Sequence, residues 1–373
     1  MIFYLHIINT MKNQQKTYII AEAGVNHNGD EALAHELVRI ASKAGADAVK
    51  FQIFLPEALI TKTAPTAEYQ AKNLADNKIS QLDMVRKLCL PNEAFVRIMD
   101  SCKQHNIDFM CTPFDHASLE YLVANTTMPY LKLSSGEVTN FPFLLAVART
   151  KLPIILSTGM ATIDEIAQAL CVIHFGYNNA QGFPANKLEL NDEILADLRN
   201  KVTLLHCVSQ YPAPIESVNL LAMETIFERF GLAVGLSDHT LGITIPTAAV
   251  ACGAKMIEKH FTYDILASGP DHVASLSPQG LIDMVIAIRD VEKARGDGNK
   301  ICQPQEQNTK AIARRSVVAS KPITVGEIFS EQNLTCKRPA TGDIMPDKLW
   351  GLLGKPAKQA YNSDDFIKKI ELE

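Results

Sequence analysis

The chain has 373 residues, 47% of them hydrophobic, and carries a formal net charge of −5. This length is sufficient for one large domain, or for one large and one small domain. A negative overall charge argues against a general attraction to nucleic acid or to membranes, so any anion site must be built locally. No apolar stretch reaches about 18 residues, and we therefore expect no transmembrane helix.

Residues 1–15 are expected to form an extension before the folded domain. The opening sequence MIFYLHIINT is apolar but short, and it lacks the basic region and the small-residue cleavage site of a signal peptide. We take Met11 as the natural start. Eight cysteines are scattered along the chain without a CxxC pair, which is typical of reduced thiols in a cytoplasmic protein.

Eight short apolar runs follow one another along the chain. They are too continuously apolar for a sheet with one wet face, and they indicate parallel strands that are buried on both sides. The predicted strands span residues 17–24, 48–54, 108–114, 130–136, 153–159, 202–208, 232–239 and 256–261.

Helical patterns separate these runs. The first has Leu33, Leu37 and Ile40 at helical spacing after Asp30, which is expected to cap it. Eight strand–helix units in about 280 residues predict a (β/α)8 TIM barrel. A doubly wound open sheet is the alternative, but the segment GVNHNG after the first strand is not a GxGxxG fingerprint. The predicted helices span residues 30–44, 91–105, 142–150, 162–175, 216–230, 242–253 and 278–294.

The composition changes after the predicted barrel, which we place at residues 16–295. Residues 296–312 are rich in Gly, Pro and Gln and indicate a linker. Residues 313–373 contain the short strand-like pieces RSVVAS and LTCKRP among many turn residues, which predicts a small β-rich domain. Within the barrel, we interpret the long intervals 55–90 and 176–200 as insertions, the first at the catalytic face.

Polar residues occur at or near the carboxyl end of nearly every predicted strand. In a TIM barrel these ends face the active site. Stability alone does not require polar groups there, so the ring indicates a site for a polar, charged ligand. Its members include Glu22, Lys50, Gln52, Thr112, Lys132, Ser135, Ser157, His206, Ser209, Tyr211, Ser237, His239, Glu258 and His260.

His239 and His260 end the last two predicted strands, which are neighbours in a barrel. Imidazoles at matching depth on neighbouring strands can share a divalent ion such as Mn, Fe, Co or Zn. Two protein ligands leave positions open for water or substrate, as a catalytic metal requires. The alternative is that each histidine only forms a hydrogen bond to a loop.

Lys50 and Lys132 lie inside otherwise apolar strands. Burying an ammonium group without a partner is costly, so each lysine needs an anion nearby. A glutamate would give a structural ion pair. The hydroxyl groups around the same barrel mouth favour instead a bound carboxylate or phosphate.

An ordered series of motifs from about residue 17 to the C-terminus resembles the N-acetylneuraminate (sialic acid) synthase family. The tail, beginning RSVVASKPITVGE, resembles the antifreeze-like (SAF) domain of those enzymes. A related type of enzyme that condenses phosphoenolpyruvate with an aldose phosphate lacks such a tail. The barrel motifs are IAEAGVNHNGD, GADAVKFQ, CTPFD, KLSSGE, LSTGM, HCVSQYP, GLSDHT and EKHFT…GPDH.

The resemblance implies a metal-dependent condensation of phosphoenolpyruvate with an open-chain N-acylated amino sugar. Water attacks C2 of phosphoenolpyruvate, C3 attacks the sugar aldehyde, and phosphate leaves. His239 and His260 then hold the metal, Mn²⁺ or Mg²⁺, and Glu22 is a catalytic residue that either moves protons at the new alcohol or activates water. Residues matching the phosphoenolpyruvate contacts are Lys50, Thr112, Lys132, Ser135, Ser157 and Ser237; those matching sugar contacts are Glu22, Gln52, Tyr211 and Asp271. Ser209 stands where relatives have an asparagine among the phosphoenolpyruvate contacts.

Arg338, in KRPATGD, matches an arginine that reaches the N-acyl group of the sugar from the partner subunit. The resemblance therefore implies a homodimer with swapped C-terminal domains. We expect N-acetylmannosamine as the sugar and N-acetylneuraminate as the product. The alternative is 2,4-diacetamido-2,4,6-trideoxymannose, which gives legionaminic acid; pseudaminate and a phosphorylated sugar are disfavoured. A non-catalytic sugar-binding protein is the alternative from another class, but the lysines and histidines are all present.

Overall fold

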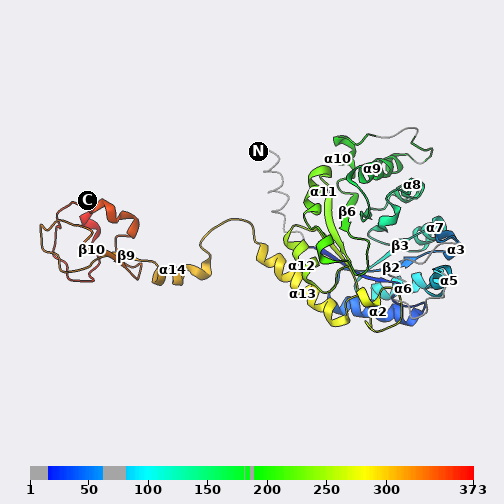
Figure 1. The fold of residues 1–373 in the computed structure, drawn as a ribbon, viewed down its shortest axis with the longest axis horizontal. Helices are drawn as coiled ribbons and strands as arrows, with labels where there is room; N and C mark the ends of the chain where they lie inside the picture. Colours follow the sequence, from blue (N-terminus) through cyan, green and yellow to red (C-terminus); the bar gives the residue numbers. More distant parts are fainter. Residues whose placement is uncertain (1–15, 62–80, 180, 185–188) are drawn as a thin grey trace. The chain divides into compact units, whose positions relative to one another are not determined.

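The computed structural model describes residues 16–61, 81–179, 181–184 and 189–373 (Figure 1). The expected extension at residues 1–15 lies outside them, as does the segment APTAEYQ of the first insertion. The chain divides into two compact units, one that ends at Asp297 and a second at Gly298–Glu373. Each unit is considered by itself.

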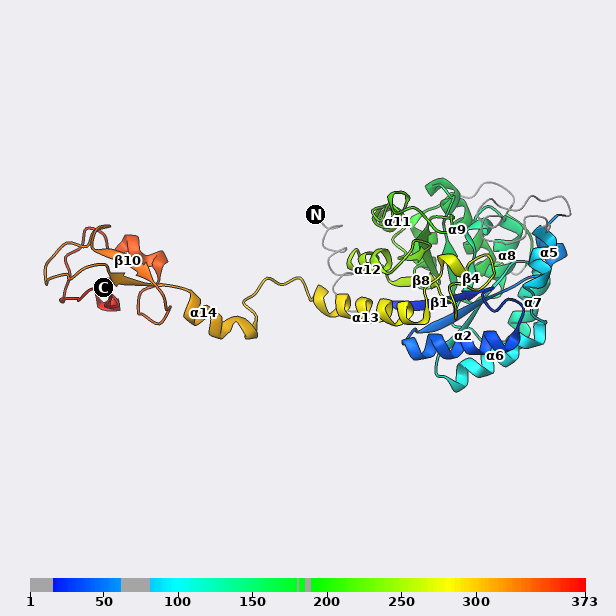
Figure 2. The ribbon, with the colours of Figure 1, turned by 60° about the horizontal axis from the view of Figure 1, so that its bottom comes forward.

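Eight parallel strands form the barrel (Figure 2), in the order β3-β2-β1-β8-β7-β6-β5-β4. The first and last strands of this order, β3 and β4, also contact each other. All eight predicted strands are confirmed. Neighbouring strands are in register, with Glu22 of β1 level with Lys50 of β2 and with His260 of β8. The strands are β1 (Tyr18–Gly24), β2 (Ala48–Ile53), β3 (Asp108–Pro113), β4 (Leu131–Leu133), β5 (Ile154–Ser157), β6 (Val202–Cys207), β7 (Ala233–Asp238) and β8 (Met256–His260).

Helices surround the strands, and the seven predicted ones are present, although α11 begins at Ala222 rather than at residue 216. Helix α7 (His116–Asn125) follows β3 and was not predicted, and the short helices α3 (Pro56–Leu59), α5 (Gln81–Lys87) and α10 (Asp192–Leu198) lie in the expected insertions. The others are α2 (Glu31–Ala44), α6 (Asn92–Gln104), α8 (Phe141–Arg149), α9 (Ile163–Asn178), α11 (Ala222–Phe230), α12 (Thr244–Ala251) and α13 (Pro278–Arg295).

Local signals explain where several helices begin and end. The side chain of Asp30 accepts hydrogen bonds from the backbone of the first turn of α2, and Gly45 ends this helix at φ 81°, a conformation that favours glycine. Thr162 and Glu165 form a reciprocal capping box at the start of α9. Ser277 caps α13, with Pro278 in its first turn.

The barrel interior has an apolar floor and a polar mouth. The floor is a buried cluster that includes Ile20, Met110, Ile155, Leu205 and Met256. Because alternate residues of a strand point to the same face, the residues two positions further along β1, β3, β5 and β8 also point inward. Those residues are Glu22, Thr112, Ser157 and Glu258.

The second unit contains the antiparallel pair β9 (Ser316–Ala319) and β10 (Leu334–Lys337) around its own small core. Helix α14 (Gln307–Ala313) occupies the end of the segment expected to be a linker, residues 296–312, and continues one residue beyond it. Trp350, the single tryptophan of the chain, is 79% exposed on this unit. In the part of the chain that the structure describes, no helix is both long and apolar enough to cross a bilayer.

Candidate active site

A cavity of about 570 Å³ opens at the carboxyl ends of the barrel strands. It brings together side chains from all eight strands or from the turns that follow them. Most of the site residues predicted from the sequence line it, namely Glu22, Lys50, Gln52, Thr112, Lys132, Ser135, Ser157, Tyr211, Ser237, His239, His260 and Asp271.

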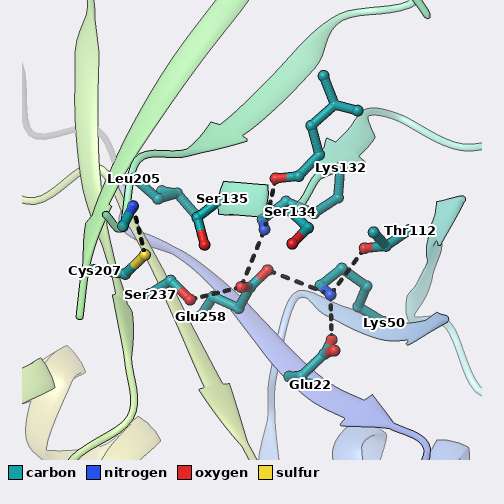
Figure 3. A network of polar contacts seen from close by, with 12 residues as sticks. Glu22, Lys50, Thr112, Lys132, Ser134, Ser135, Leu205, Cys207, Ser237 and Glu258 are labelled. Atoms are coloured by element: carbon teal, nitrogen blue, oxygen red, sulfur yellow. Dashed lines mark hydrogen bonds and ion pairs between the residues drawn. The ribbon is translucent and has the colours of Figure 1, made fainter. Parts of the chain in front are cut away.

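Two lysines and two glutamates form a buried ion network in the floor of this cavity (Figure 3). Lys50 Nζ lies 2.5 Å from the Glu22 carboxylate and 3.7 Å from that of Glu258. Lys132 Nζ lies 3.4 Å from the other oxygen of Glu258, and Ser237 Oγ donates to the same oxygen at 2.8 Å. Each buried lysine thus has a carboxylate neighbour, as the ion-pair alternative required, while both side chains also face the cavity.

Burial and mutual charge shift the pKa values of this network in different directions. Burial raises the pKa of Glu22 above its ordinary value, although Lys50 opposes this shift. Burial alone would also raise the pKa of Glu258, but Lys132 and Lys50 outweigh it and lower this pKa. Burial lowers the pKa of Lys132, with Glu258 in opposition. Glu258 is therefore the carboxylate that both ammonium groups hold in the ionised state.

Hydroxyl groups complete the lysine-lined side of the cavity. Lys50 Nζ donates to Thr112 Oγ1 at 3.1 Å, and the hydroxyl groups of Ser135 and Ser209 lie 3.0 Å apart. Ser157 Oγ is buried without a hydrogen-bond partner in the structure. An unpaired buried hydroxyl is costly, so this group is available to a ligand.

Gly159 allows the chain to pass closely behind these hydroxyl groups. A Cβ atom at this position would lie 2.3 Å from Ser209 Oγ and 2.8 Å from Cys207 Sγ, so any other residue here would displace these groups. Ser209 does not line the cavity itself but supports Ser135 from behind.

The imidazoles of His239 and His260 lie side by side, with ring centroids 5.7 Å apart. Tyr211 contacts both rings, at centroid distances of 4.0 and 5.7 Å. A nitrogen–metal bond of about 2 Å places each ring centre roughly 3 Å from a shared ion, so this separation is compatible with one ion between the rings.

The hydrogen bonds and charges of the two histidines suit metal ligation. His239 Nδ1 donates to the Val208 carbonyl at 2.6 Å, which leaves Nε2 as the lone-pair nitrogen. His260 Nδ1 is buried without a hydrogen-bond partner and lies 4.0 Å from the Asp271 carboxylate. Burial lowers the pKa of His239, and burial together with His239 holds the pKa of His260 well below its ordinary value. Both rings are therefore neutral, the form that binds a metal.

No cluster of three or more His, Cys, Asp or Glu side chains that could hold a metal occurs among the described residues. His239 and His260 are the two side chains that would hold an ion here. Near the pair, Gln52 Nε2 donates to Glu22 Oε1 at 2.9 Å, and burial raises the pKa of Asp271 to about 6.

One residue of the predicted ring points elsewhere. His206 was included in the ring at the barrel mouth, but its Nε2 bonds to the Val218 carbonyl and its side chain does not line the cavity. Its neighbours Leu205 and Cys207 point inward, so strand alternation directs His206 toward the helices. Arg338, the remaining predicted residue, directly follows β10 in the second unit, which is considered by itself.

Sequence reasoning missed the apolar part of the cavity. Val25, Phe54, Val85 and Leu88 line it as well, from the segments that follow β1 and β2. Val25 lies within the motif IAEAGVNHNGD, but its apolar side chain attracted no functional interpretation, and the apolar residues of the other segments resemble any small core under a loop. Only the position of the segments after adjacent strands gave a signal.

Comparison with known proteins agrees with this architecture. The model of the NeuB family matches residues 37–300, and that of the SAF domain matches residues 314–373. N,N'-diacetyllegionaminic acid synthase of Campylobacter jejuni is 47% identical over 95% of this chain and 100% of its own length. The protein of the same name from Legionella pneumophila is 42% identical, with 90% of this chain and 89% of that protein aligned.

Among solved structures, the N-acetylneuraminic acid (sialic acid) synthetase of Leptospira borgpetersenii in complex with citrate superposes with a TM-score of 0.63. It is 31% identical, and the match covers 79% of this chain and 90% of that one. The chain therefore belongs to the NeuB family of enzymes and carries an SAF domain at its C-terminal end.

Proposed function

We propose that this enzyme condenses phosphoenolpyruvate with 2,4-diacetamido-2,4,6-trideoxymannose, forming N,N'-diacetyllegionaminic acid and releasing phosphate. The identity of 47%, over the full length of the Campylobacter jejuni synthase, is the observation that carries this proposal. The proposal makes N,N'-diacetyllegionaminic acid the first candidate product, whereas the sequence alone led us to expect N-acetylneuraminate. Formation of N-acetylneuraminate from N-acetylmannosamine is the second candidate, favoured by the likeness to the Leptospira borgpetersenii structure.

The lysine-lined side of the cavity would hold phosphoenolpyruvate. Lys50 and Lys132 offer two ammonium groups about the Glu258 carboxylate, and the phosphate and carboxylate of the substrate would share them. The hydroxyl groups of Thr112, Ser135, Ser157 and Ser237 would complete the contacts. The unpartnered Ser157 hydroxyl supports this assignment, because a bound phosphate would satisfy it.

The opposite side of the mouth would hold the sugar aldehyde. His239 and His260 would bind the divalent ion, Mn²⁺ or Mg²⁺, which supplies a Lewis acid for the aldehyde oxygen. Gln52, Tyr211 and Asp271 would orient the sugar chain beside C3 of phosphoenolpyruvate. Such positioning lowers the barrier by replacing a bimolecular encounter with a fixed approach.

Glu22 lies where the two halves meet. Its carboxylate contacts Lys50 Nζ at 2.5 Å and accepts a hydrogen bond from Gln52 at 2.9 Å. It would hold or move a proton at the oxygen that becomes the new alcohol.

We also propose a homodimer in which the second unit of one subunit completes the site of the other. Arg338 is the residue expected to cross, and it would contact an N-acyl group of the sugar. The reaction would take place in the cytoplasm, where phosphoenolpyruvate is formed.

A phosphate-release assay tests the proposal directly. Purified protein is incubated with phosphoenolpyruvate, Mn²⁺ and either sugar, and the product is identified by mass. Phosphate release with the diacetamido sugar supports the first candidate, and release with N-acetylmannosamine alone supports the second. If no amino sugar causes release, a non-catalytic sugar-binding role is favoured instead.

A further inference from the structure

Apolar side chains form a continuous wall on one side of the active-site cavity, above the buried ion network of the lysines and glutamates. This apolar wall consists of Val25, Phe54, Ile60, Val85, Leu88 and Phe114, all of which line the cavity. The residues come from segments that directly follow β1, β2 and β3, and from α5 and the residue just after it.

Contacts among the six side chains make the wall one surface. Val25, Val85 and Leu88 form a small core of their own, each less than 10% exposed, with Phe54 and Ile60 packed against it. Phe54 in turn meets Phe114 edge to face, at a centroid distance of 6.3 Å. This core is separate from the main cores of the barrel.

The side of the cavity opposite the apolar wall is polar. Beyond the ends of β4 to β8 the cavity is lined by groups such as Ser135, Tyr211, His239 and Asp271. The proposed function places the sugar aldehyde at His239 and His260. The far end of an open-chain sugar must then extend either toward solvent or along the apolar wall.

We propose that the apolar wall binds the C6 end of the sugar and selects a 6-deoxy sugar, whose terminal carbon is a methyl group. This inference rests on the proposed function. A methyl group gains free energy against Val85 and Ile60, whereas a terminal hydroxyl group would lose its water and find no partner among the six wall residues.

The expected selectivity is moderate. An apolar pocket rejects a substrate that merely adds a hydroxyl group by about 100-fold at most, because the hydroxyl can still turn toward water. We therefore expect a preference of about 10- to 100-fold in kcat/KM, rather than the stronger exclusion that a polar site achieves. Thr61 and Gln81 line the cavity from the same segments and provide polar groups for the acetamido substituent.

The test compares two sugars that differ only at C6: 2-acetamido-2,6-dideoxymannose and N-acetylmannosamine. Wild-type enzyme is expected to prefer the deoxy sugar by about 10- to 100-fold in kcat/KM. Val85→Thr, which replaces one methyl group by a hydroxyl group, and Ile60→Thr, which replaces the ethyl branch by a hydroxyl group, should each reduce this ratio at least about threefold. The KM for phosphoenolpyruvate should stay unchanged.

Val172→Thr is the matched control. Val172 lies in helix α9, is 5% exposed compared with 8% for Val85, and does not line the cavity. Its ratio between the two sugars should equal that of the wild-type enzyme. Equal kcat/KM for both sugars in the wild type, or an unchanged ratio in both wall variants, would overturn the inference. The wall residues would then only form a small hydrophobic core.

A third substrate separates this inference from the proposed function. If 2,4-diacetamido-2,4,6-trideoxymannose and both test sugars release no phosphate, the proposed function fails. Binding of the two test sugars in the presence of phosphoenolpyruvate, measured by saturation-transfer NMR, then decides the role of the wall. Preferential binding of the deoxy sugar, lost in Val85→Thr, would support it, and equal binding would overturn it.

Discussion

At the scale of single residues, the neutral imidazoles of His239 and His260 are the groups on which the metal assignment depends. His239→Ala or His260→Ala should weaken Mn²⁺ binding by more than about 100-fold, since losing even an outer partner of a ligand costs 10- to 100-fold. Electron paramagnetic resonance of free Mn²⁺ measures this without turnover. His206→Ala is the control, because His206 also follows an apolar strand run but faces the helices. Unchanged Mn²⁺ affinity in both histidine variants would remove the metal from this site.

His27, in the turn after β1, couples stability to pH. Its Nδ1 accepts a hydrogen bond from the Gly29 amide, its Nε2 is buried without a partner, and burial lowers its pKa from 6.5 to about 4. The unfolded chain takes up a proton below pH 6.5, whereas the folded chain does so only near pH 4. The stability that this residue contributes is therefore fully present above pH 6.5 and is lost as the pH falls toward 4.

The variant His27→Asn tests this, because the amide can replace the Nδ1 acceptor but cannot take up a proton. From pH 7 to pH 4, the free energy of unfolding of the wild type should fall by about 3 kcal/mol relative to that of the variant, at about 1.4 kcal/mol per tenfold change in proton affinity. Urea unfolding followed by circular dichroism at several pH values measures it. Parallel pH dependences would contradict the assignment.

At the scale of elements, a buried ion pair joins β7 to β8 on the side away from the cavity. Asp238 and Lys259 lie level in the two strands, and their charged atoms are 2.5 Å apart. Thr240 also donates to Asp238, at 3.1 Å from its amide and 3.0 Å from its hydroxyl, and its carbonyl accepts from Lys259. The two residues directly precede His239 and His260, so the pair fixes the register of both histidines.

Lys259→Met should destabilise the barrel by about 3–5 kcal/mol, because it leaves the Asp238 charge buried without its partner. The double variant Asp238→Leu with Lys259→Met should recover much of this loss, since an apolar pair of similar volume is often tolerated. Urea denaturation of both variants measures the difference. A single variant as stable as the wild type would show that the pair does not hold the strands.

The strands could be predicted because parallel strands buried on both faces leave continuous apolar runs. Helix α7 could not, because Tyr121 and Val123 spread apolar residues around it, and only the Asp115 cap marks its start. The inward-facing polar residues could be predicted because they lie at the ends of strands. The outward direction of His206 follows only from the alternation of side chains along β6, in which Leu205 and Cys207 point inward. The apolar part of the cavity depends on how separate loops pack together, which a single sequence does not encode locally.

At the scale of the whole molecule, the proposed exchange of C-terminal units between subunits predicts complementation. Arg338→Ala and Lys50→Ala, refolded together, should give hybrids with one intact site of two, and so about a quarter of wild-type activity. The assay uses a sugar concentration at which each variant alone is nearly inactive. Lys50→Ala mixed with Lys132→Ala is the control, because both changes lie in the barrel and no hybrid site is intact. Activity no higher than this control would exclude a shared site.

Trp350 gives the chain an optical reporter of its own assembly. As the single indole of the chain, exposed on the SAF domain, it emits as a solvated fluorophore while that domain is uncovered. If a second subunit covers this surface, the emission maximum should move to shorter wavelength and collisional quenching by acrylamide should weaken. A dilution series of the unlabelled protein can therefore follow subunit dissociation by fluorescence alone.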